Sequence, residues 1–168
     1  MGVASVQEWS AQVSGELDAD GYRRHAPRLM ALAAALVGPA DAGDVVSASI
    51  TRLIAARSFG RVENLEAYLT RAVVNEARSW ARSGARRGVR DVRWLRAAVD
   101  HQEHVDRLGD TELTAALLRL PIRQRAVVFL TYWADLTPEA VAAQLGISEG
   151  SVRKHLARAR ASLREVLS

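Results

Sequence analysis

The most informative segment of this sequence lies near its C-terminal end and reads Leu136-Thr137-Pro138-Glu139-Ala140-Val141-Ala142-Ala143-Gln144-Leu145-Gly146-Ile147-Ser148-Glu149-Gly150-Ser151-Val152-Arg153-Lys154-His155-Leu156. Thr137 is a favourable helix N-cap, and Pro138 follows at the first helical position, where its missing N–H costs no hydrogen bond. Gly146 suits the left-handed conformation that often ends a helix, and Ser148 can cap a new helix directly after it. The segment therefore predicts two helices joined by a tight turn.

The apolar residues of this segment share one side of both predicted helices. Hydrophobic staples are expected at the start of each helix, from Leu136 to Val141 and from Ile147 to Val152. The residues expected to point inward are Val141, Leu145, Val152 and Leu156. This pattern predicts that the two helices pack against each other and against a common core.

The outward side of the second of these helices is polar and basic. Its candidate DNA-binding residues are Ser148, Ser151, Arg153, Lys154, His155 and Arg158. A recognition helix directs donors from its first turns at base edges in the major groove, while basic groups hold phosphates. An ordinary helical hairpin can also expose a basic face. Two caps, a turn glycine and two staples at the right offsets favour a DNA-binding helix-turn-helix over that hairpin.

The rest of the chain also predicts helices, because proline is scarce and no segment alternates like a strand. The helices are expected at about 20–37, 41–57, 64–82, 111–119, 121–134, 138–145 and 149–167. Glycines and closely spaced charges interrupt the helical pattern at 84–110. We therefore predict an all-α fold of two small helical domains, residues 1–83 and 111–168, joined by a flexible linker at 84–110.

The helix expected at 64–82 carries a polar stripe on one face, made of Tyr68, Arg71, Asn75, Arg78 and Arg82. The residues expected in the core on its other side are Leu65, Leu69, Ala72, Val73 and Trp80. Asn64 is a suitable N-cap for this helix. Such a stripe can hold a phosphate backbone and offer an amide and an aromatic ring to bases. The same spacing also fits a solvated surface helix, and the pattern alone does not separate the two.

The helix expected at 41–57 is amphipathic. Its apolar residues recur at helical spacing and are Val45, Val46, Ile50, Leu53 and Ile54. We predict that all five lie on one face of this helix.

Charge is distributed unevenly along the 168 residues, whose formal net charge is +4. Basic residues outnumber acidic ones by eight to two at 71–98 and by seven to four at 120–168. Acidic residues lead by five to two at 99–119, between these basic blocks. Basic blocks attract phosphate and speed association with nucleic acid.

Several other classes of protein are disfavoured by the composition. The absence of cysteine excludes disulfides and thiolate metal sites and fits a cytoplasmic protein. No apolar run approaches the roughly 20 residues of a membrane-spanning helix, and the first residues lack the basic start of a signal peptide. We therefore expect no membrane insertion.

No catalytic or cofactor site is predicted. His101 and His104 lie near Asp100 and Glu103, but this short set lacks a further spaced ligand, so we expect no metal. The sequence contains no phosphate-cradling glycine loop and no recognisable nucleophile and base pair. We predict neither a cofactor nor an enzymatic activity.

The two modules together resemble the extracytoplasmic-function (ECF) sigma factors of the sigma-70 family, in an actinobacterial-like form. Residues 22–29, 40–46 and 66–80 resemble parts of sigma region 2, and residues 120–128 and 146–160 resemble parts of region 4. The order, the spacing and the joint presence of both modules are specific to that family. The resemblance implies promoter-specific transcription initiation together with core RNA polymerase.

The resemblance also assigns candidate sites. It implies that region 4 reads the minus-35 element as duplex through Ser148, Ser151, Arg153, Lys154, His155 and Arg158. It implies that region 2 captures the minus-10 element as single strand through Tyr68, Arg71, Asn75, Arg78 and Arg82. A pocket for an unstacked base is expected at the loop 58–64 and at the start of the helix that follows it. Core polymerase is expected to bind Asp41, Asp44, Ser47 and Thr51.

The second helix of the chain departs from the family pattern. Gly43, Ser47, Ser49, Ile50 and Ile54 stand where acidic, glutamine and aromatic residues are usual, and Ser79 stands where aspartate is common. One alternative is therefore a sigma-like decoy that binds a regulator protein. Another is a stand-alone helix-turn-helix regulator that acts as a dimer at a palindromic site. The family resemblance further implies an anti-sigma or other regulatory protein as partner.

Overall fold

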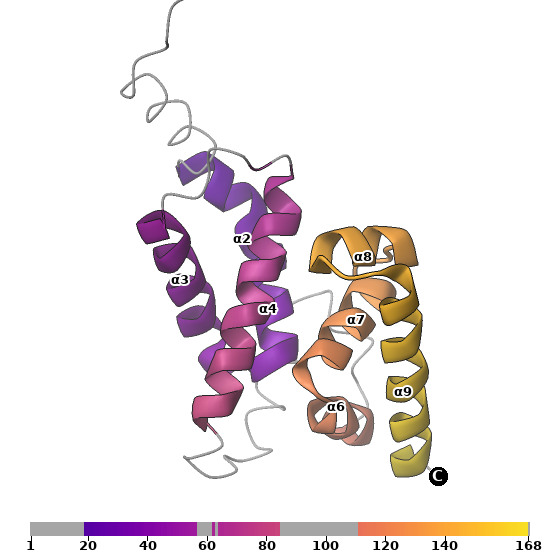
Figure 1. Cartoon of the computed structure of the whole chain (residues 1–168). Coiled ribbons are helices and arrows are strands. Elements are labelled where there is room, and N and C mark those ends of the chain that lie inside the picture. Colours follow the sequence, from indigo (N-terminus) through magenta and orange to yellow (C-terminus); the bar gives the residue numbers. More distant parts are fainter. Residues whose placement is uncertain (1–18, 57–61, 63, 85–110, 168) are drawn as a thin grey trace, which may run out of the picture.

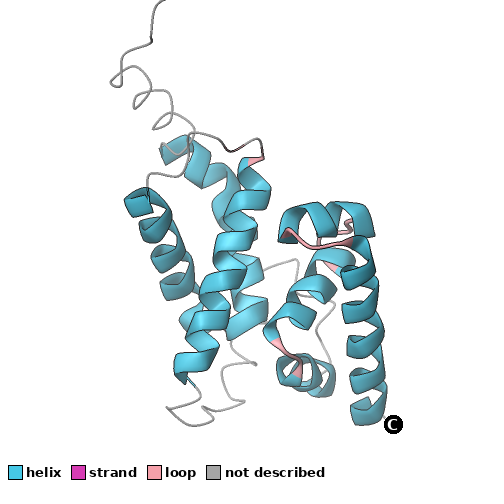
Figure 2. Ribbon diagram, in the orientation of Figure 1, coloured by secondary structure: helices cyan, strands magenta, loops and turns pink. Residues whose placement is uncertain are grey.

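The computed structural model describes residues 19–56, 62, 64–84 and 111–167, and these ranges form seven α-helices and no strand. Figure 1 shows two groups of helices lying side by side, and Figure 2 shows that short loops join the helices within each group. The first group contains α2 (Ala19–Val37), α3 (Pro39–Ala56) and α4 (Leu65–Gly84). The second contains α6 (Thr111–Arg119), α7 (Ile122–Tyr132), α8 (Pro138–Leu145) and α9 (Glu149–Leu167). The predicted all-α architecture is confirmed.

The first group is built around an apolar core between its three helices. Its largest fully buried side chains are Leu32, Leu36, Val45, Val46, Leu69 and Val73. Trp80 and Leu65 pack at the edge of this core. These positions confirm the inward faces predicted for the second and third helices. Burial of such large aliphatic side chains is the main force that holds the three helices together.

Two helix ends in this group are set by local capping residues, of which Asn64 was predicted. Gly38 adopts a φ of 97°, and its N–H donates to the carbonyl of Ala34 at 2.9 Å before Pro39 begins α3. At the start of α4, the Asn64 side-chain oxygen accepts a hydrogen bond from the Ala67 N–H at 2.9 Å. Local sequence signals thus set both boundaries.

One part of the predicted apolar face of α3 is wrong. Ile54 is 60% exposed, whereas Val45 and Val46 are buried and Ile50 and Leu53 pack at the core edge. The reason is helical geometry, because Ile54 lies seven and ten residues beyond Ser47 and Asp44, on the exposed side of α3. The side chain therefore joins the outer surface of this helix.

The second group has a core of its own, formed by α7, α8 and α9. Val127, Leu130, Val141 and Val152 are almost completely buried in it. Leu136, Leu145 and Ile147 pack against this core, as the predicted staples require. Helices α8 and α9 and the turn between them therefore have the arrangement of a helix-turn-helix.

The two groups pack directly on one another. Helix α4 contacts α7 and α8, and α2 contacts α6 and α7. Ile122 and Ala126 of α7 belong to the buried core of the first group. The predicted linker lies outside the described ranges except for Gly84, which ends α4, and the predicted loop at 58–64 is likewise described only at residues 62 and 64.

Among the seven helices, none combines the length and the apolar character needed to cross a membrane.

Candidate nucleic-acid interface

The turn before α9 fixes the orientation of the helix that carries the predicted minus-35 residues. Gly146 is left-handed, with φ 64° and ψ 39°, and its N–H donates to the Ala142 carbonyl. The Ile147 N–H donates to the same carbonyl at 3.1 Å, which completes a Schellman-like end to α8. The Thr137 hydroxyl accepts from the Ala140 N–H at 3.2 Å, and the Ser148 hydroxyl accepts from the Ser151 N–H at 3.2 Å. Both predicted caps are present.

The outward side of α9 presents most of the predicted residues to solvent. Ser148, Arg153, Lys154 and Arg158 are exposed, while Ser151 and His155 are half-buried. Arg153 pairs with Glu149 one turn earlier, with 2.7 Å between Nη2 and Oε2. An exposed pair of this kind contributes little to stability, so Arg153 remains available to another anion.

His155 lies in a strongly basic environment. Burial, followed by the charges of Arg123, Arg158 and Lys154, lowers the pKa of its imidazole below 6.5. Its Nδ1 is buried and has no hydrogen-bond partner among the described residues. His155 is therefore neutral at pH 7 and can take up a proton when an anion approaches this part of α9.

The polar stripe of α4 faces the second group of helices. Arg71 and Asn75 line a small pocket together with Arg123, Leu145 and Ile147. Arg71, Asn75 and Arg82 are exposed, whereas Tyr68 and Arg78 are half-buried. The structure therefore places Arg71 and Asn75, two of the predicted minus-10 residues, next to the helix-turn-helix.

Arg123 is a basic residue that no sequence pattern singles out. It lines the same pocket as Arg71 and Asn75 of α4, and its charge lowers the pKa of both Arg78 on α4 and His155 on α9. For Arg78 this repulsion is the largest cause, ahead of burial and of Arg82. The side chains of Arg78, Arg123 and His155 form a basic seam between α4, α7 and α9. Only the folded structure shows that Arg123 lies near Arg78 and His155, because the three residues are far apart in sequence.

The predicted polymerase-binding residues lie along α3. Asp44, Ser47 and Thr51 are exposed and Asp41 is half-buried. The Thr51 hydroxyl donates to the Ser47 carbonyl at 2.9 Å, so it is partly satisfied within the helix. Ile54 continues the same face and is 60% exposed.

No cluster of three histidine, aspartate or glutamate side chains that could hold a metal is found within 19–56, 64–84 and 111–167. His101 and His104 lie outside these ranges.

Comparison with known proteins gives matches to both groups of helices. Residues 22–87 match the family Sigma-70 region 2, and residues 110–163 match the family Sigma-70, region 4. The chain is 34% identical over 137 residues to the RNA polymerase sigma-E factor of Streptomyces coelicolor, covering 77% of this chain and 73% of that protein. The sigma-E factor of Streptomyces antibioticus is also 34% identical, with 77% and 72% covered.

A solved structure is similar over nearly the whole chain. It is a chain from the co-crystal structure of the sigma factor RpoE in complex with the anti-sigma factor NepR from Bartonella quintana. The TM-score is 0.68 at 25% sequence identity, and the match covers 90% of this chain and 97% of that one.

Proposed function

The chain belongs to the sigma-70 family of RNA polymerase sigma factors, in its ECF group, and from this membership we propose how its surfaces act in promoter recognition. Its partners are core RNA polymerase and promoter DNA. One observation carries the proposal: the same chain holds the basic stripe of α4 inside its region 2 match and the capped helix-turn-helix inside its region 4 match. A stand-alone helix-turn-helix regulator does not require the basic stripe of α4.

The α9 surface reads the minus-35 element in the major groove. Ser148, Ser151 and His155 offer donors or acceptors to base edges, and Arg153, Lys154 and Arg158 hold phosphates. The caps at Thr137 and Ser148 and the Gly146 turn support this role, because they fix the helix that carries these side chains.

The α4 surface captures the minus-10 element as a single strand. Arg71, Arg78 and Arg82 hold its backbone, while Tyr68 and Asn75 contact bases. Taking a base out of the stack costs a few kcal/mol, and contacts to the displaced strand must recover this cost. The excess of arginine on α4 supports the assignment.

Core polymerase binds the outer face of α3 through Asp41, Asp44, Ser47 and Thr51. We add Ile54 to this set, since it is the large apolar side chain exposed on that face. An apolar anchor among polar residues supplies binding energy where the acidic and aromatic residues usual in the family are absent.

The domains divide as 1–83 for region 2, 84–110 for the linker and 111–168 for region 4. The solved relative comes from a complex with an anti-sigma factor, and we extend such regulation to this chain. We place the protein in the cytoplasm, where polymerase and DNA are found, and assign it no catalytic step.

The test is reconstitution with bacterial core RNA polymerase. The purified chain should co-elute with core enzyme and direct transcription from the region upstream of its own gene. Lys154→Ala with Arg158→Ala should abolish promoter-specific transcripts and leave co-elution intact, because these residues face DNA. Arg119→Ala, an exposed arginine on α6, is the matched control and should leave both unchanged.

Failure to co-elute would overturn the polymerase-binding assignment and favour the decoy that binds a regulator protein. Co-elution without promoter-specific transcripts would instead overturn the assignment of α4 and α9 to promoter DNA. The two arms therefore test different surfaces.

A further inference from the structure

A small pocket lies where α4, α7 and the turn before α9 meet. It is lined by buried apolar side chains, among them Val74 and Val127, and by the exposed polar side chains of Arg71, Asn75 and Arg123. All three polar side chains can donate hydrogen bonds. None of the described residues that line the pocket is acidic. The pocket therefore combines an apolar wall with several donors and two positive charges.

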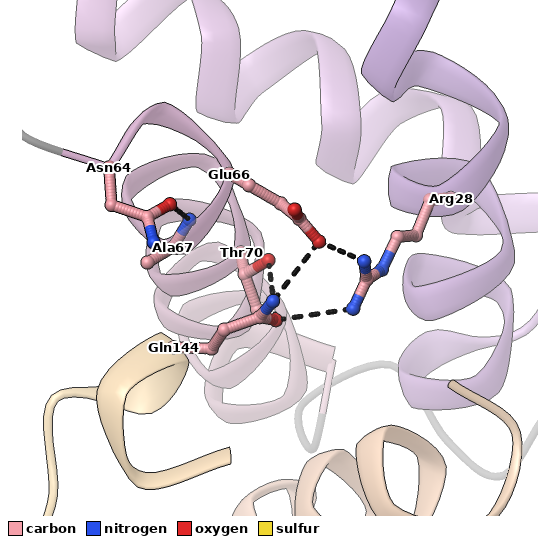
Figure 3. A network of polar contacts seen from close by, with 6 residues as sticks. All are labelled: Arg28, Asn64, Glu66, Ala67, Thr70 and Gln144. Atoms are coloured by element: carbon pink, nitrogen blue, oxygen red, sulfur yellow. Dashed lines mark hydrogen bonds and ion pairs between the residues drawn. The ribbon is translucent and has the colours of Figure 1, made fainter. Parts of the chain in front are cut away.

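The carboxylates of the helices that form this pocket are engaged elsewhere. Glu66 of α4 pairs with Arg28 and accepts a hydrogen bond from Nε2 of Gln144 at 3.0 Å, and Figure 3 shows these side chains converging. Glu76, the other acidic residue of α4, is 6% exposed and pairs with Arg52 on α3, with 2.6 Å between Oε2 and Nη1. Helix α7 has no acidic residue. Neither α4 nor α7 therefore supplies a counter-charge to the pocket.

The positive charge of Arg123 is uncompensated. Arg123 forms no ion pair within the described part of the chain. Its charge is the largest cause that lowers the pKa of Arg78, and it is second to burial in lowering the pKa of His155. The other charges that act on these two groups are also positive and belong to Arg82, Lys154 and Arg158. An anion bound beside Arg123 would relieve the repulsion that both groups experience.

The size of the pocket limits the ligand. Its cavity volume is about 30 Å³. A site for a single water molecule needs roughly 10–15 Å³, so the pocket has room for about two groups of that size. This space suits the head of an oxyanion and is too small for a nucleotide base.

The polar groups of the pocket favour an oxyanion with two charges. A guanidinium binds phosphate through parallel N–H donors, and the side chains of Arg71 and Arg123 provide two such groups. Two cations gain more from a dianion than from a monoanion. The Asn75 amide adds a neutral donor, and the apolar wall strengthens each of these interactions by excluding water.

We infer that this pocket binds a small dianionic oxyanion, either inorganic phosphate or the phosphate of a monoester, held by Arg71, Asn75 and Arg123. The inference goes beyond promoter recognition, because Arg123 is not assigned to DNA and the site does not require that α4 binds a DNA strand. The backbone of DNA carries the same phosphate oxygens with one charge per phosphate. Charge therefore distinguishes a free phosphate from a phosphodiester as the ligand.

The first experiment is a titration of the isotope-labelled chain with sodium sulfate, followed by the backbone and side-chain N–H signals in NMR spectra. Sodium chloride keeps the ionic strength constant, and sulfate remains a dianion at every pH used. The signals of Arg71, Asn75 and Arg123 should shift and reach saturation, with a dissociation constant of about 1–10 mM, as expected for a few charge-assisted hydrogen bonds. Shifts that grow linearly without saturation would overturn the site.

Substitutions at Arg123 test the ligand set. Arg123→Gln should weaken sulfate binding about fivefold or more, because one charged donor group is lost. Arg123→Lys keeps the charge but loses the planar fork, so its affinity should lie between the two. Arg119→Gln removes the same charge at an exposed position of α6 and should bind sulfate as the unmodified chain does. Circular dichroism checks that each variant remains helical. Unchanged binding in Arg123→Gln, or an equal loss in Arg119→Gln, would overturn the assignment.

His155 provides an independent readout of where the anion lies. Its imidazole experiences the charges of Arg123 from α7 and of Lys154 and Arg158 from α9, and burial lowers its pKa further. Saturating sulfate should raise the pKa of His155, measured from the ring C–H signals, since the anion offsets the charge of Arg123. In Arg123→Gln the pKa should be higher without sulfate and should respond less to it. A pKa that does not change at saturation would place the anion away from Arg123 and overturn the proposal.

The two sources of phosphate are separated with methyl phosphate and dimethyl phosphate at pH 7.5. Methyl phosphate is mainly a dianion at this pH, because its second pKa is about 6 as in other phosphate monoesters, and it should bind about as tightly as sulfate. Dimethyl phosphate carries one charge, as a DNA phosphate does, and should bind about fivefold or more weakly. Equal binding of dimethyl phosphate would overturn the dianion assignment and indicate a contact with the DNA backbone. Binding of sulfate without binding of methyl phosphate would overturn phosphate as the ligand.

Discussion

Arg71 of α4 lies against the turn at Gly146 of the helix-turn-helix, although the two residues belong to different sigma regions. A Cβ on Gly146 would stand 3.1 Å from Cδ and 3.2 Å from Nη1 of Arg71. The backbone of Gly146 is also left-handed, with φ 64°. This glycine therefore meets two requirements at once: it ends α8 and it lets α4 approach.

Gly146→Ala should destabilise the protein by about 1–2 kcal/mol, because an L side chain in the left-handed region is strained and the new methyl group meets Arg71. Urea unfolding followed by circular dichroism measures the change. Gly43→Ala is the control: Gly43 lies within α3, no atom lies within 4 Å of the place its methyl group would take, and alanine there should stabilise by about 0.5–1 kcal/mol. Equal effects at the two glycines would contradict this explanation.

The helices of this protein could be predicted from the sequence because their signals are local. Thr137, Gly146 and Ser148 specify the helix-turn-helix within twelve residues, and Asn64 marks the start of α4. The positions of the buried aliphatic residues follow from helical spacing alone. The prediction that Ile54 shares one face with the other four apolar residues of α3 is wrong, since Ile54 is 60% exposed on the side that carries Asp44 and Ser47.

The packing of the two groups could not be predicted, because it depends on residues far apart in the chain. Gln144 is 78 residues from Glu66 and 116 from Arg28. A glutamine on the surface of a short helix carries no signal that its partner is another domain. The candidate DNA-binding residues were identifiable by type and spacing, but their mutual position across the seam was not.

Folding stability should fall as pH is lowered from 7.5 to 6.0. Burial and neighbouring arginines lower the pKa values of His25 and His155 in the folded protein below 6.5. The unfolded chain then binds more protons below that pH, so the free energy of unfolding decreases as pH falls. Urea midpoints across this range provide the measurement, and His25→Asn with His155→Asn should flatten the dependence. If the urea midpoint of the unmodified protein does not change between pH 7.5 and 6.0, the prediction is wrong.

Binding of minus-35 duplex should show the opposite pH dependence. Phosphates near α9 favour the charged form of His155 and offset the repulsion from Arg123, Arg158 and Lys154. The affinity for duplex should therefore rise severalfold between pH 7.5 and 6.0. A rise of about this size is expected when one group takes up a proton on binding. Fluorescence anisotropy at constant ionic strength tests this. His155→Asn should remove the pH dependence of the affinity. If the affinity of that variant still changes with pH as before, another group is responsible.

Lys154→Ala should weaken binding to all minus-35 duplexes by a similar factor. Lys154 is an exposed point charge, so we expect a phosphate contact, and its loss should reduce the slope of log K against log salt by about 1. Anisotropy titrations at several salt concentrations measure the slope. Arg119→Ala, on α6, should leave it unchanged. A loss confined to one DNA sequence would instead indicate that Lys154 reads a base.

Ile54→Ser should weaken binding to core RNA polymerase without destabilising the protein. Ile54 is 60% exposed, so the folded chain loses little buried apolar area when it is replaced. At an interface the same side chain would be removed from water, and its loss should raise the dissociation constant about three- to thirtyfold, as for an anchor worth roughly 1–2 kcal/mol. Ala55→Ser, the exposed neighbour, is the control.

Surface-immobilised core enzyme gives the dissociation constants, and urea unfolding gives the stabilities. Unchanged binding in Ile54→Ser would remove Ile54 from the polymerase-binding face and leave only the polar residues Asp41, Asp44, Ser47 and Thr51 to account for polymerase binding.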